Sequence, residues 1–404
     1  MKWNLVPLGT VCTVSSSKRI FAKEYRTEGI PFYRGKEVIE KHKGNPVSTE
    51  LFISKERYEE IRCKYDVPQI GDILLTSVGT LGVSWLVDET EFYFKDGNLT
   101  WLRAKDGLLN KFLYLWLNSD DAKHQIDMMC IGSTQKALTI ETINKFVIPL
   151  PSMQEQESIC AVIYPIIERI KNNRKINDNL YQQALALYRS LFVDFERIPA
   201  AERVASELGD IPVGWGIKTL SEVTTNIRTR VREHSYKVLS ALNSGCLQPS
   251  EEYFTKQVFS KDISNYIVVD KNDFAYNPAR VNIGSIGLNT LGYIGCVSPV
   301  YVVFRTEPEY HYFMDFFIKS ARFKEEVRVR ASGSVRQSMN YTDFGLIKIA
   351  YPPLAIVRQF NAEYEIIVKC INRNLEENVA LESIRDSLIP KLLAGEIDLS
   401  SVTL

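Results

Sequence analysis

The stretch that decides the organisation of this 404-residue chain is Ile148-Pro149-Leu150-Pro151-Ser152-Met153-Gln154-Glu155-Gln156. Its two prolines end the strand-like run before them, because proline cannot donate to a strand ladder. Ser152 and Glu155 have the spacing of a capping box, the pattern that starts a helix. About forty residues with apolar side chains at helical spacing follow, up to Phe192. The sequence therefore predicts a long helix directly behind a globular segment.

The same plan occurs twice in the chain. A second copy begins as Ile349-Ala350-Tyr351-Pro352-Pro353-Leu354 and leads into another apolar-periodic run that ends at Leu393. Adding 201 to residue 148 gives residue 349, and the same offset relates Gly132-Ser133-Thr134-Gln135-Lys136 to Gly333-Ser334-Val335-Arg336-Gln337. A period of about 200 residues is too long for a solenoid. It predicts a tandem duplication of one domain plus one helix, with chance similarity between glycine-bearing turns as the alternative.

Both helical runs carry their apolar residues in alternating steps of four and three, the heptad seam of a coiled coil. Asn173 and Asn177 lie on the first seam, and the offset of 201 relates them to Asn374 and Asn378. A buried asparagine in such a seam lowers stability and tends to fix the register and orientation of the partner helix. Two matched pairs near the middle favour an antiparallel helix pair whose register these residues set. The alternative is that the asparagines lie at a solvated edge.

These patterns predict an α+β fold in which two similar globular domains are separated by two long antiparallel coiled-coil helices, as a pseudo-twofold internal repeat. The predicted boundaries are a first globular domain at 1–150, a first spacer helix at 151–198, a second globular domain with a linker at 199–350, and a second spacer helix with the C-terminal tail at 351–404. Pro165 and Pro390 lie inside the helical runs, and each predicts either a kink or a restart of its helix.

Composition and charge limit the possible functions. The chain is 45% hydrophobic and 24% charged, as in ordinary globular domains, and no apolar run is long enough to predict a membrane span. Seven scattered cysteines without a Cys-x-x-Cys pair favour a reducing cytoplasm over a disulfide framework or a zinc site. Because 49 basic residues balance 49 acidic ones, any nucleic-acid contact must come from local patches or be helped by a partner.

Sequence motifs for catalysis are absent. The four histidines are far apart and have no metal-ligand spacing. The chain contains neither a Walker phosphate loop nor a Gly-x-Gly-x-x-Gly dinucleotide loop, and the scattered carboxylates form no recognisable nuclease pattern. We therefore expect a non-catalytic protein with no metal or cofactor of its own.

Basic residues occur together with aromatic ones in both globular segments, as at nucleic-acid interfaces, although such charge runs are more often simply solvated. Arginine and lysine bind phosphates and guanine edges, and glutamine reads adenine. The glycine-led loops at Gly132 and Gly333 add hydroxyl, amide and cationic groups. The predicted DNA-binding residues are Lys18, Arg19, Arg34, Lys36, Ser133, Thr134, Gln135, Lys136, Arg228, Arg230, Arg280, Ser334, Arg336 and Gln337.

Taken together, the motifs resemble those of the specificity subunits of type I restriction-modification systems. The resemblance covers essentially the whole chain and departs at Ile356-Val357, where the family has Glu-Gln, which predicts a looser start for the second helix. It rests on the 148–156 stretch, the Gly132 loop, Leu208-Gly209-Asp210-Ile211-Pro212-Val213-Gly214-Trp215 and the tail Leu388-Ile389-Pro390-Lys391-Leu392-Leu393-Ala394-Gly395-Glu396-Ile397.

The resemblance implies a function in DNA recognition. It implies two target-recognition domains that each read half of a bipartite site in double-stranded DNA. It also implies that the helix pair separates these domains and docks two modification subunits, which bind S-adenosylmethionine and methylate adenine. Restriction subunits, which are motor nucleases, join the complex for cleavage. None of that chemistry is expected in this chain.

Two other functions remain open from the residues alone. One is a non-catalytic coiled-coil scaffold that carries two protein-interaction domains and has no affinity for DNA. The other is a fused restriction-methylation enzyme, which would need cofactor and catalytic motifs that the sequence lacks.

Overall fold

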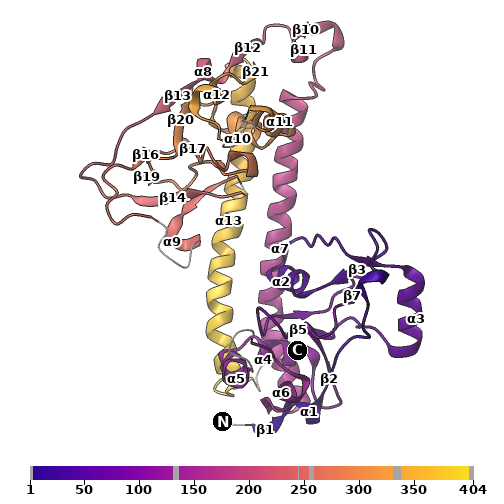
Figure 1. The fold of residues 1–404 in the computed structure, drawn as a ribbon. Helices are drawn as coiled ribbons and strands as arrows, with labels where there is room; N and C mark the ends of the chain where they lie inside the picture. Colours follow the sequence, from indigo (N-terminus) through magenta and orange to yellow (C-terminus); the bar gives the residue numbers. More distant parts are fainter. Residues whose placement is uncertain (1–2, 131–135, 244, 254–258, 331–337, 400–404) are drawn as a thin grey trace. The chain divides into compact units, whose positions relative to one another are not determined.

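The computed structural model of the chain describes residues 3–130, 136–243, 245–253, 259–330 and 338–399 (Figure 1). It divides into two compact units, the first made of Met1–Lys175 with Arg373–Leu404 and the second of Ile176–Asn372. The division cuts through both long helices, because the globular part of each unit packs against helical segments from both of them.

The first unit is built from three small sheets. β1 (Asn4–Pro7) pairs with β9 (Val147–Leu150). A four-stranded sheet has the order β2 (Cys12–Ser15), β8 (Leu99–Ala104), β5 (Ile73–Thr76) and β6 (Ser84–Leu86), and a three-stranded sheet has the order β4 (Phe52–Ile53), β3 (Ile30–Tyr33) and β7 (Tyr93–Phe94). The helices are α1 (Leu8–Val11), η1 (Ala22–Glu24), α2 (Gly35–Lys43), α3 (Lys55–Tyr65), α4 (Asn110–Leu117), α5 (Asp120–Met129) and α6 (Ile140–Asn144).

The second unit repeats this topology. β12 (Gly216–Thr219) pairs with β21 (Lys348–Tyr351), and a four-stranded sheet has the order β13 (Thr224–Ile227), β20 (Val302–Thr306), β17 (Phe274–Tyr276) and β18 (Ile286–Leu288). The other sheet has the order β15 (Leu247–Pro249), β14 (Lys237–Ala241), β19 (Gly295–Val297) and β16 (Ile267–Val269). The helices are η2 (Ala200–Glu202), α8 (Leu220–Val223), α9 (Ser250–Tyr253), η3 (Val281–Ile283), α10 (His311–Lys319), α11 (Ala321–Arg330) and α12 (Tyr341–Gly345), and the segment after η2 forms the hairpin β10 (Arg203–Ser206) and β11 (Gly209–Pro212). The matching strand orders confirm the predicted α+β internal repeat.

Each copy ends in one long helix, α7 (Met153–Phe192) or α13 (Leu354–Leu393). Both helices continue through their internal prolines, so the alternative of a helix restart at Pro165 or Pro390 is wrong. A proline removes only one backbone donor, which a helix of 40 residues can lose without ending. Pro390 also lies in the last turn, just before Gly395, whose left-handed φ of 71° ends the helix.

The two helices start differently, as the departure at Ile356-Val357 suggests. In α7, Gln156 is fully buried, and its amide accepts from Leu109 N–H at 2.8 Å and donates to the Gly107 carbonyl at 2.9 Å. The equivalent residue in α13, Val357, is also fully buried, but in an apolar cluster. The second copy therefore replaces a polar attachment of helix to domain by hydrophobic packing.

Within each unit the segments of α7 and α13 run antiparallel, as predicted. In the first unit Ile163 shares a core cluster with Leu392, whereas ten residues further along α7 the Asn173 amide donates to Asn378 Oδ1 at 2.9 Å. In the second unit Asn177 lies opposite Ile371, and Tyr188 and Phe192 pack on Phe360, nearer the start of α13. Residues later in α7 therefore lie opposite residues earlier in α13.

The seam asparagines divide into two environments. Asn173 is fully buried and Asn378 is 6% exposed, so the solvated-edge alternative is wrong for this pair. Asn177 and Asn374 are half-buried. The Asn173–Asn378 hydrogen bond pairs two polar groups in the buried part of the seam, and any sliding of one helix along the other would break it.

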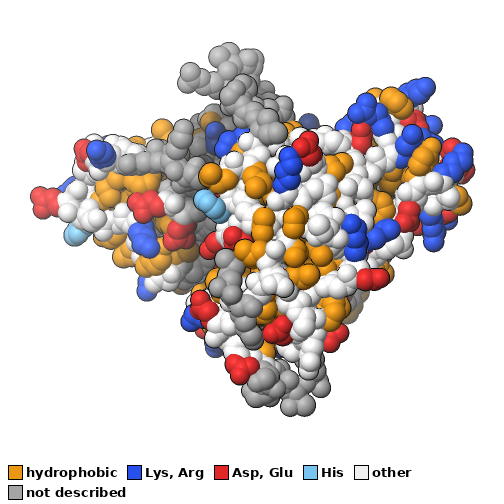
Figure 2. Space-filling model, turned by 90° about the horizontal axis from the view of Figure 1, so that it is seen from below, with side chains coloured by type: hydrophobic (Ala, Val, Ile, Leu, Met, Phe, Trp, Pro, Cys, Tyr) orange, Lys and Arg blue, Asp and Glu red, His pale blue; other side chains and the backbone are white. Residues whose placement is uncertain are grey.

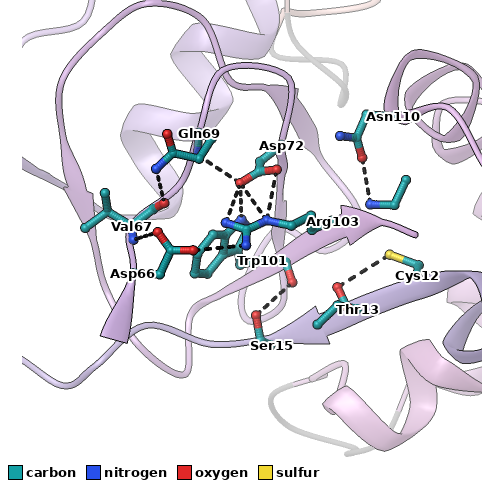
Figure 3. A network of polar contacts seen from close by, with 11 residues as sticks. Cys12, Thr13, Ser15, Asp66, Val67, Gln69, Asp72, Trp101, Arg103 and Asn110 are labelled. Atoms are coloured by element: carbon teal, nitrogen blue, oxygen red, sulfur yellow. Dashed lines mark hydrogen bonds and ion pairs between the residues drawn. The ribbon is translucent and has the colours of Figure 1, made fainter. Parts of the chain in front are cut away.

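In each unit a buried aspartate directly precedes one strand of the four-stranded sheet, β5 or β17, and pairs with an arginine of the neighbouring strand. Figure 3 shows the network of the first unit, around Asp72. Asp72 accepts a hydrogen bond from Trp101 Nε1 at 2.8 Å and forms an ion pair with Arg103 at 3.2 Å. Asp273 forms the equivalent pair with Arg305 at 2.6 Å, and the side chains of both aspartates are at most 4% exposed. We call this aspartate–arginine ion pair the clamp. It occurs in both units although the surrounding sequence differs.

We expect Asp72→Asn to lower the stability of the first unit by about 1–3 kcal/mol, because it leaves Arg103 facing a buried neutral group. Asp66→Asn is the matched control, since Asp66 binds the same guanidinium at 3.0 Å but its side chain is 50% exposed. The control should cost no more than about 1 kcal/mol. Scanning calorimetry of both variants measures the difference, and equal losses would contradict the assignment of the clamp to Asp72.

Candidate nucleic-acid interface

Strand order brings two chain segments to one end of the main sheet in each unit. β2 and β5 are both antiparallel to β8, with Ser15 opposite Trp101 and Thr76 opposite Leu99. Both strands therefore end where β8 begins. β13 and β17 have the same relation to β20 in the second unit. We call this the strand-exit end of each sheet, and most of the described DNA-binding candidates follow these strands.

The segment after β2, residues 16–26, is the first basic arm. Ile20 anchors it in the core at 2% exposure, while the side chains of Lys18 and Arg19 are exposed. The Lys18 N–H donates to Tyr93 Oη at 2.7 Å, and the Ser17 hydroxyl donates to the Phe94 carbonyl at 2.9 Å. Burial raises the pKa of Tyr93 to about 12, so its phenol stays protonated at neutral pH. The arm therefore has a fixed backbone and solvent-facing cations.

The segment after β13, residues 228–237, is the second basic arm. Val231 is its fully buried anchor, and its N–H donates to the Tyr266 carbonyl at 2.9 Å. Arg228 and Arg230 are exposed, and Arg230 donates to Asn265 Oδ1 at 2.9 Å. Each unit thus presents cations beside one buried aliphatic residue at the same place in its topology.

A hollow of about 410 Å³ lies beside the first basic arm. One wall is residues 19–22 of the arm, and the other is residues 95–98, the turn between β7 and β8. Across it the Arg19 guanidinium binds Asp96 at 2.7 Å. The Asn98 carbonyl accepts from Ser77 N–H at 2.9 Å, which joins this turn to the exit of β5.

The remaining described candidates of the first unit lie close to this hollow. Lys95, in its wall, donates its N–H to the Tyr33 carbonyl at 2.8 Å, and the next residue after Tyr33 is Arg34. Lys36 follows and is exposed. Lys136 is also exposed and lies just before Leu138, whose N–H donates to the Ser77 carbonyl at 2.9 Å.

Arg34 is less available than its neighbours. Its guanidinium donates to Glu37 Oε1 at 2.9 Å, and this hydrogen bond raises the pKa of Arg34. Because Glu37 is 1% exposed, the arginine compensates a buried charge at the start of α2. Its first role is therefore structural.

The second unit has a similar arrangement. Arg280 is exposed in the turn after β17, at the strand-exit end of its sheet. Two residues before it, the Pro278 carbonyl accepts from Met339 N–H at 3.1 Å, which matches the contact of Leu138 with Ser77. In both units the chain that follows the glycine-led loop is therefore tied to the same turn.

Six predicted residues lie outside the described part of the chain, and the structure says nothing of their side chains: Ser133, Thr134, Gln135, Ser334, Arg336 and Gln337. The structure also adds residues that the sequence analysis did not single out. Lys95 and Asn98 come to the first basic arm through strand pairing across more than 70 residues of sequence, and Phe21 lies in the arm itself. For Phe21, an apolar residue between Arg19 and Lys23 was an available signal.

Other basic residues of the second unit are neutralised locally. On α11, Arg328 binds Glu325 at 2.6 Å and Arg330 binds Glu326 at 3.1 Å. Figure 2 shows lysine and arginine side chains interspersed with aspartate and glutamate on the face that it displays. In the first basic arm Arg19 is likewise paired with Asp96, whereas the Lys18, Arg228 and Arg280 side chains are exposed.

In the described part of the chain, no group of histidine, cysteine, aspartate or glutamate side chains is arranged to hold a metal ion. Among the described helices, none is long and apolar enough to cross a membrane.

Comparison with known proteins gives a consistent assignment. Residues 1–182 match the family described as the type I restriction modification DNA specificity domain. Over 357 residues the chain is 25% identical to the type I restriction enzyme MjaIX specificity subunit of Methanocaldococcus jannaschii, covering 83% of this chain and 79% of that protein. These matches bear out the resemblance of this chain to the specificity subunits of type I restriction-modification systems.

Two further comparisons extend the match. The chain is 30% identical over 196 residues to the putative type I restriction enzyme specificity subunit S.HindORF215P of Haemophilus influenzae, covering 47% of this chain and 48% of that protein. Its fold is shared with the type I restriction-modification S subunit from M. genitalium, with a TM-score of 0.58 at 14% identity, covering 97% of this chain and 96% of that one. The predicted role in recognition of DNA sequence is thereby confirmed at the level of the family.

If the second basic arm contacts phosphates, Arg228→Ala and Arg230→Ala should each weaken DNA binding about equally on all sequences. Each should also lower the slope of log affinity against log salt by about one, because one phosphate contact is lost. Lys271→Ala is the control, since Lys271 is exposed at the opposite end of the same sheet, before β17. Titrations of the assembled complex at several salt concentrations test this, and an equal effect of the control would contradict it.

Proposed function

We propose that each unit of this chain reads one half of a bipartite site in double-stranded DNA through its strand-exit end. The observation that carries the proposal is an arrangement that occurs in both units. At the strand-exit end of the sheet lie a basic arm with a buried anchor and a turn that is hydrogen-bonded to Leu138 or Met339. A half-site of a few base pairs gives limited discrimination, because one bidentate contact is worth about 1–3 kcal/mol. Joining two recognition units in one chain raises the overall affinity for DNA by about 10²–10⁴-fold where both units can bind at once.

The proposal makes this chain a non-catalytic subunit. Two modification subunits would bind S-adenosylmethionine and methylate adenine, and restriction subunits would add cleavage. A complex of this kind would act on DNA in the cytoplasm. Partner proteins would dock on the long helices, where Leu375 and Val379 lie one turn apart on the same face of α13 with exposed apolar side chains. Exposed apolar side chains on the two helices include Ile176, Ile366, Leu375, Val379 and Ile384, which are 45–68% exposed.

We further propose that the helix pair sets the length of the unread gap between the half-sites. Each helix has 40 residues, which corresponds to about 60 Å at 1.5 Å per residue. The Asn173–Asn378 hydrogen bond supports this role, because a ruler must keep one register.

The competing function, a scaffold with two protein-interaction domains, predicts no effect on DNA modification. The discriminating experiment maps methylated adenines in cells with and without this chain. We expect a bipartite motif to lose methylation completely when the chain is removed, because the modification subunits would have no sequence reader. An unchanged methylation pattern would support the scaffold.

The ruler is tested by adding one heptad to each helix, after Leu180 in α7 and after Lys369 in α13. Seven residues lengthen a helix by about 10 Å, or about three base pairs of DNA. The methylated motif should therefore keep both half-sites and gain about three base pairs between them. An insertion in α7 alone is the control, and it should abolish methylation because the seam loses its register. Altered half-sites with an unchanged gap would disprove the ruler.

A further inference from the structure

Phe21 is an exposed aromatic residue on a rigid part of the first basic arm. Its side chain is 56% exposed, next to the fully anchored Ile20. The Phe21 N–H donates to Glu24 Oε2 at 2.8 Å, and the Glu24 N–H donates back to the Phe21 carbonyl at 2.8 Å. Arg57 holds the Glu24 carboxylate at 2.8 Å. The backbone is therefore held on both sides of an apolar ring that faces solvent.

The surroundings of Phe21 are polar and cationic. It lines the hollow of about 410 Å³ together with Arg19 and Lys95. The one carboxylate in the wall, Asp96, is already paired with Arg19, and its side chain is only 12% exposed. Asn98, at the far side, is fixed by its contact with Ser77 at the exit of β5. An aromatic face flanked by two cations has the chemistry to bind a nucleic-acid base with its adjoining phosphates.

We propose that Phe21 stacks on, or inserts between, bases at the edge of the half-site read by the first unit, while Arg19 and Lys95 bind the flanking phosphates. The inference rests on the proposed function of the strand-exit end and adds a specific contact to it. Apolar wedges of this kind unstack a base step and make recognition depend on how easily that step deforms. Phe21 therefore contributes to sequence preference at a position that no hydrogen-bonding side chain reads.

The second unit has a different residue at this place. Ile20 lies five residues after the end of β2 and Val231 four residues after the end of β13, so the two arms differ by one residue in length before the anchor. The residue that follows the anchor is Phe21 in the first arm and Arg232 in the second, and Arg232 is exposed and has a left-handed φ of 56°. The first arm thus presents an aromatic ring where the second presents a cation. Stacking on Phe21 adds affinity to the first arm without releasing counterions, so this part of the affinity does not depend on salt. Binding through the second arm, which presents a cation at this place, is more dependent on salt.

The test uses the assembled complex of this chain with its modification subunits and a duplex that carries the mapped motif. Phe21→Ala should weaken binding about 10- to 100-fold, the range for loss of one stacked base, with an unchanged slope of log affinity against log salt. Arg19→Ala should lower that slope by about one. Ile70→Ala is the matched control, because Ile70 is 75% exposed in the turn before β5, at the opposite end of the same sheet.

A second variant separates stacking from folding effects. Phe21→Trp should bind as well as the natural chain, and its indole fluorescence should be quenched on the specific duplex. If Phe21→Ala binds within twofold of the natural complex, or if its loss comes with a lower salt slope, the stacking contact is wrong. If the natural complex shows no preference for the mapped motif, the proposed function itself fails, independently of Phe21.

Discussion

The antiparallel pairing of one central strand with both of its neighbours determines where the basic arms lie, at the end of each sheet where we propose that DNA is recognised. β8 and β20 each run opposite to the strands on their two sides, so the two flanking strands of each sheet leave at the same end. A parallel partner on one side would send one exit to the far end of the sheet. The basic arm and the turn that binds Leu138 or Met339 lie at the same end of the sheet because of this pairing, although they are far apart in sequence.

Because the domain is duplicated, comparison of the two copies separates the features that they share from those that have diverged. The copies share the aspartate–arginine clamp, the anchor of the basic arm and the contact of the glycine-led loop, all of which fix backbone position. They differ in the start of the long helix, where buried Gln156 corresponds to buried Val357. They also differ in the residue after the arm anchor, which is Phe21 in one copy and Arg232 in the other. The shared features position the interface, and the side chains presented on it have diverged, as expected for two readers of different half-sites.

Much of the fold could be predicted because its signals are local and occur twice. The capping box at Ser152 starts α7 as expected, with the Glu155 N–H donating to Ser152 Oγ at 3.3 Å, and the repeat identified the second helix. The internal prolines left a kink or a restart open, and of these the restart is wrong, because tertiary packing holds each helix together despite one missing backbone donor. Strand pairing between segments that are far apart in the chain could not be predicted from the sequence either. No pattern in the sequence joins Lys95 to Arg19, since their proximity follows from the parallel pairing of β3 with β7 and the contacts of the arm.

The balance of charge in the chain has a consequence for how it binds. Equal numbers of basic and acidic residues, many joined in ion pairs such as Arg328–Glu325, leave few free cations to attract DNA from a distance. Non-specific affinity for DNA is mainly electrostatic, so a neutral reader should release unrelated sequences readily. Under the proposed function, the remaining contacts are short-ranged and depend on a matching base sequence and on simultaneous engagement of both units. A chain that binds poorly by charge alone would then gain selectivity, because partner subunits could supply general affinity for DNA without sequence preference.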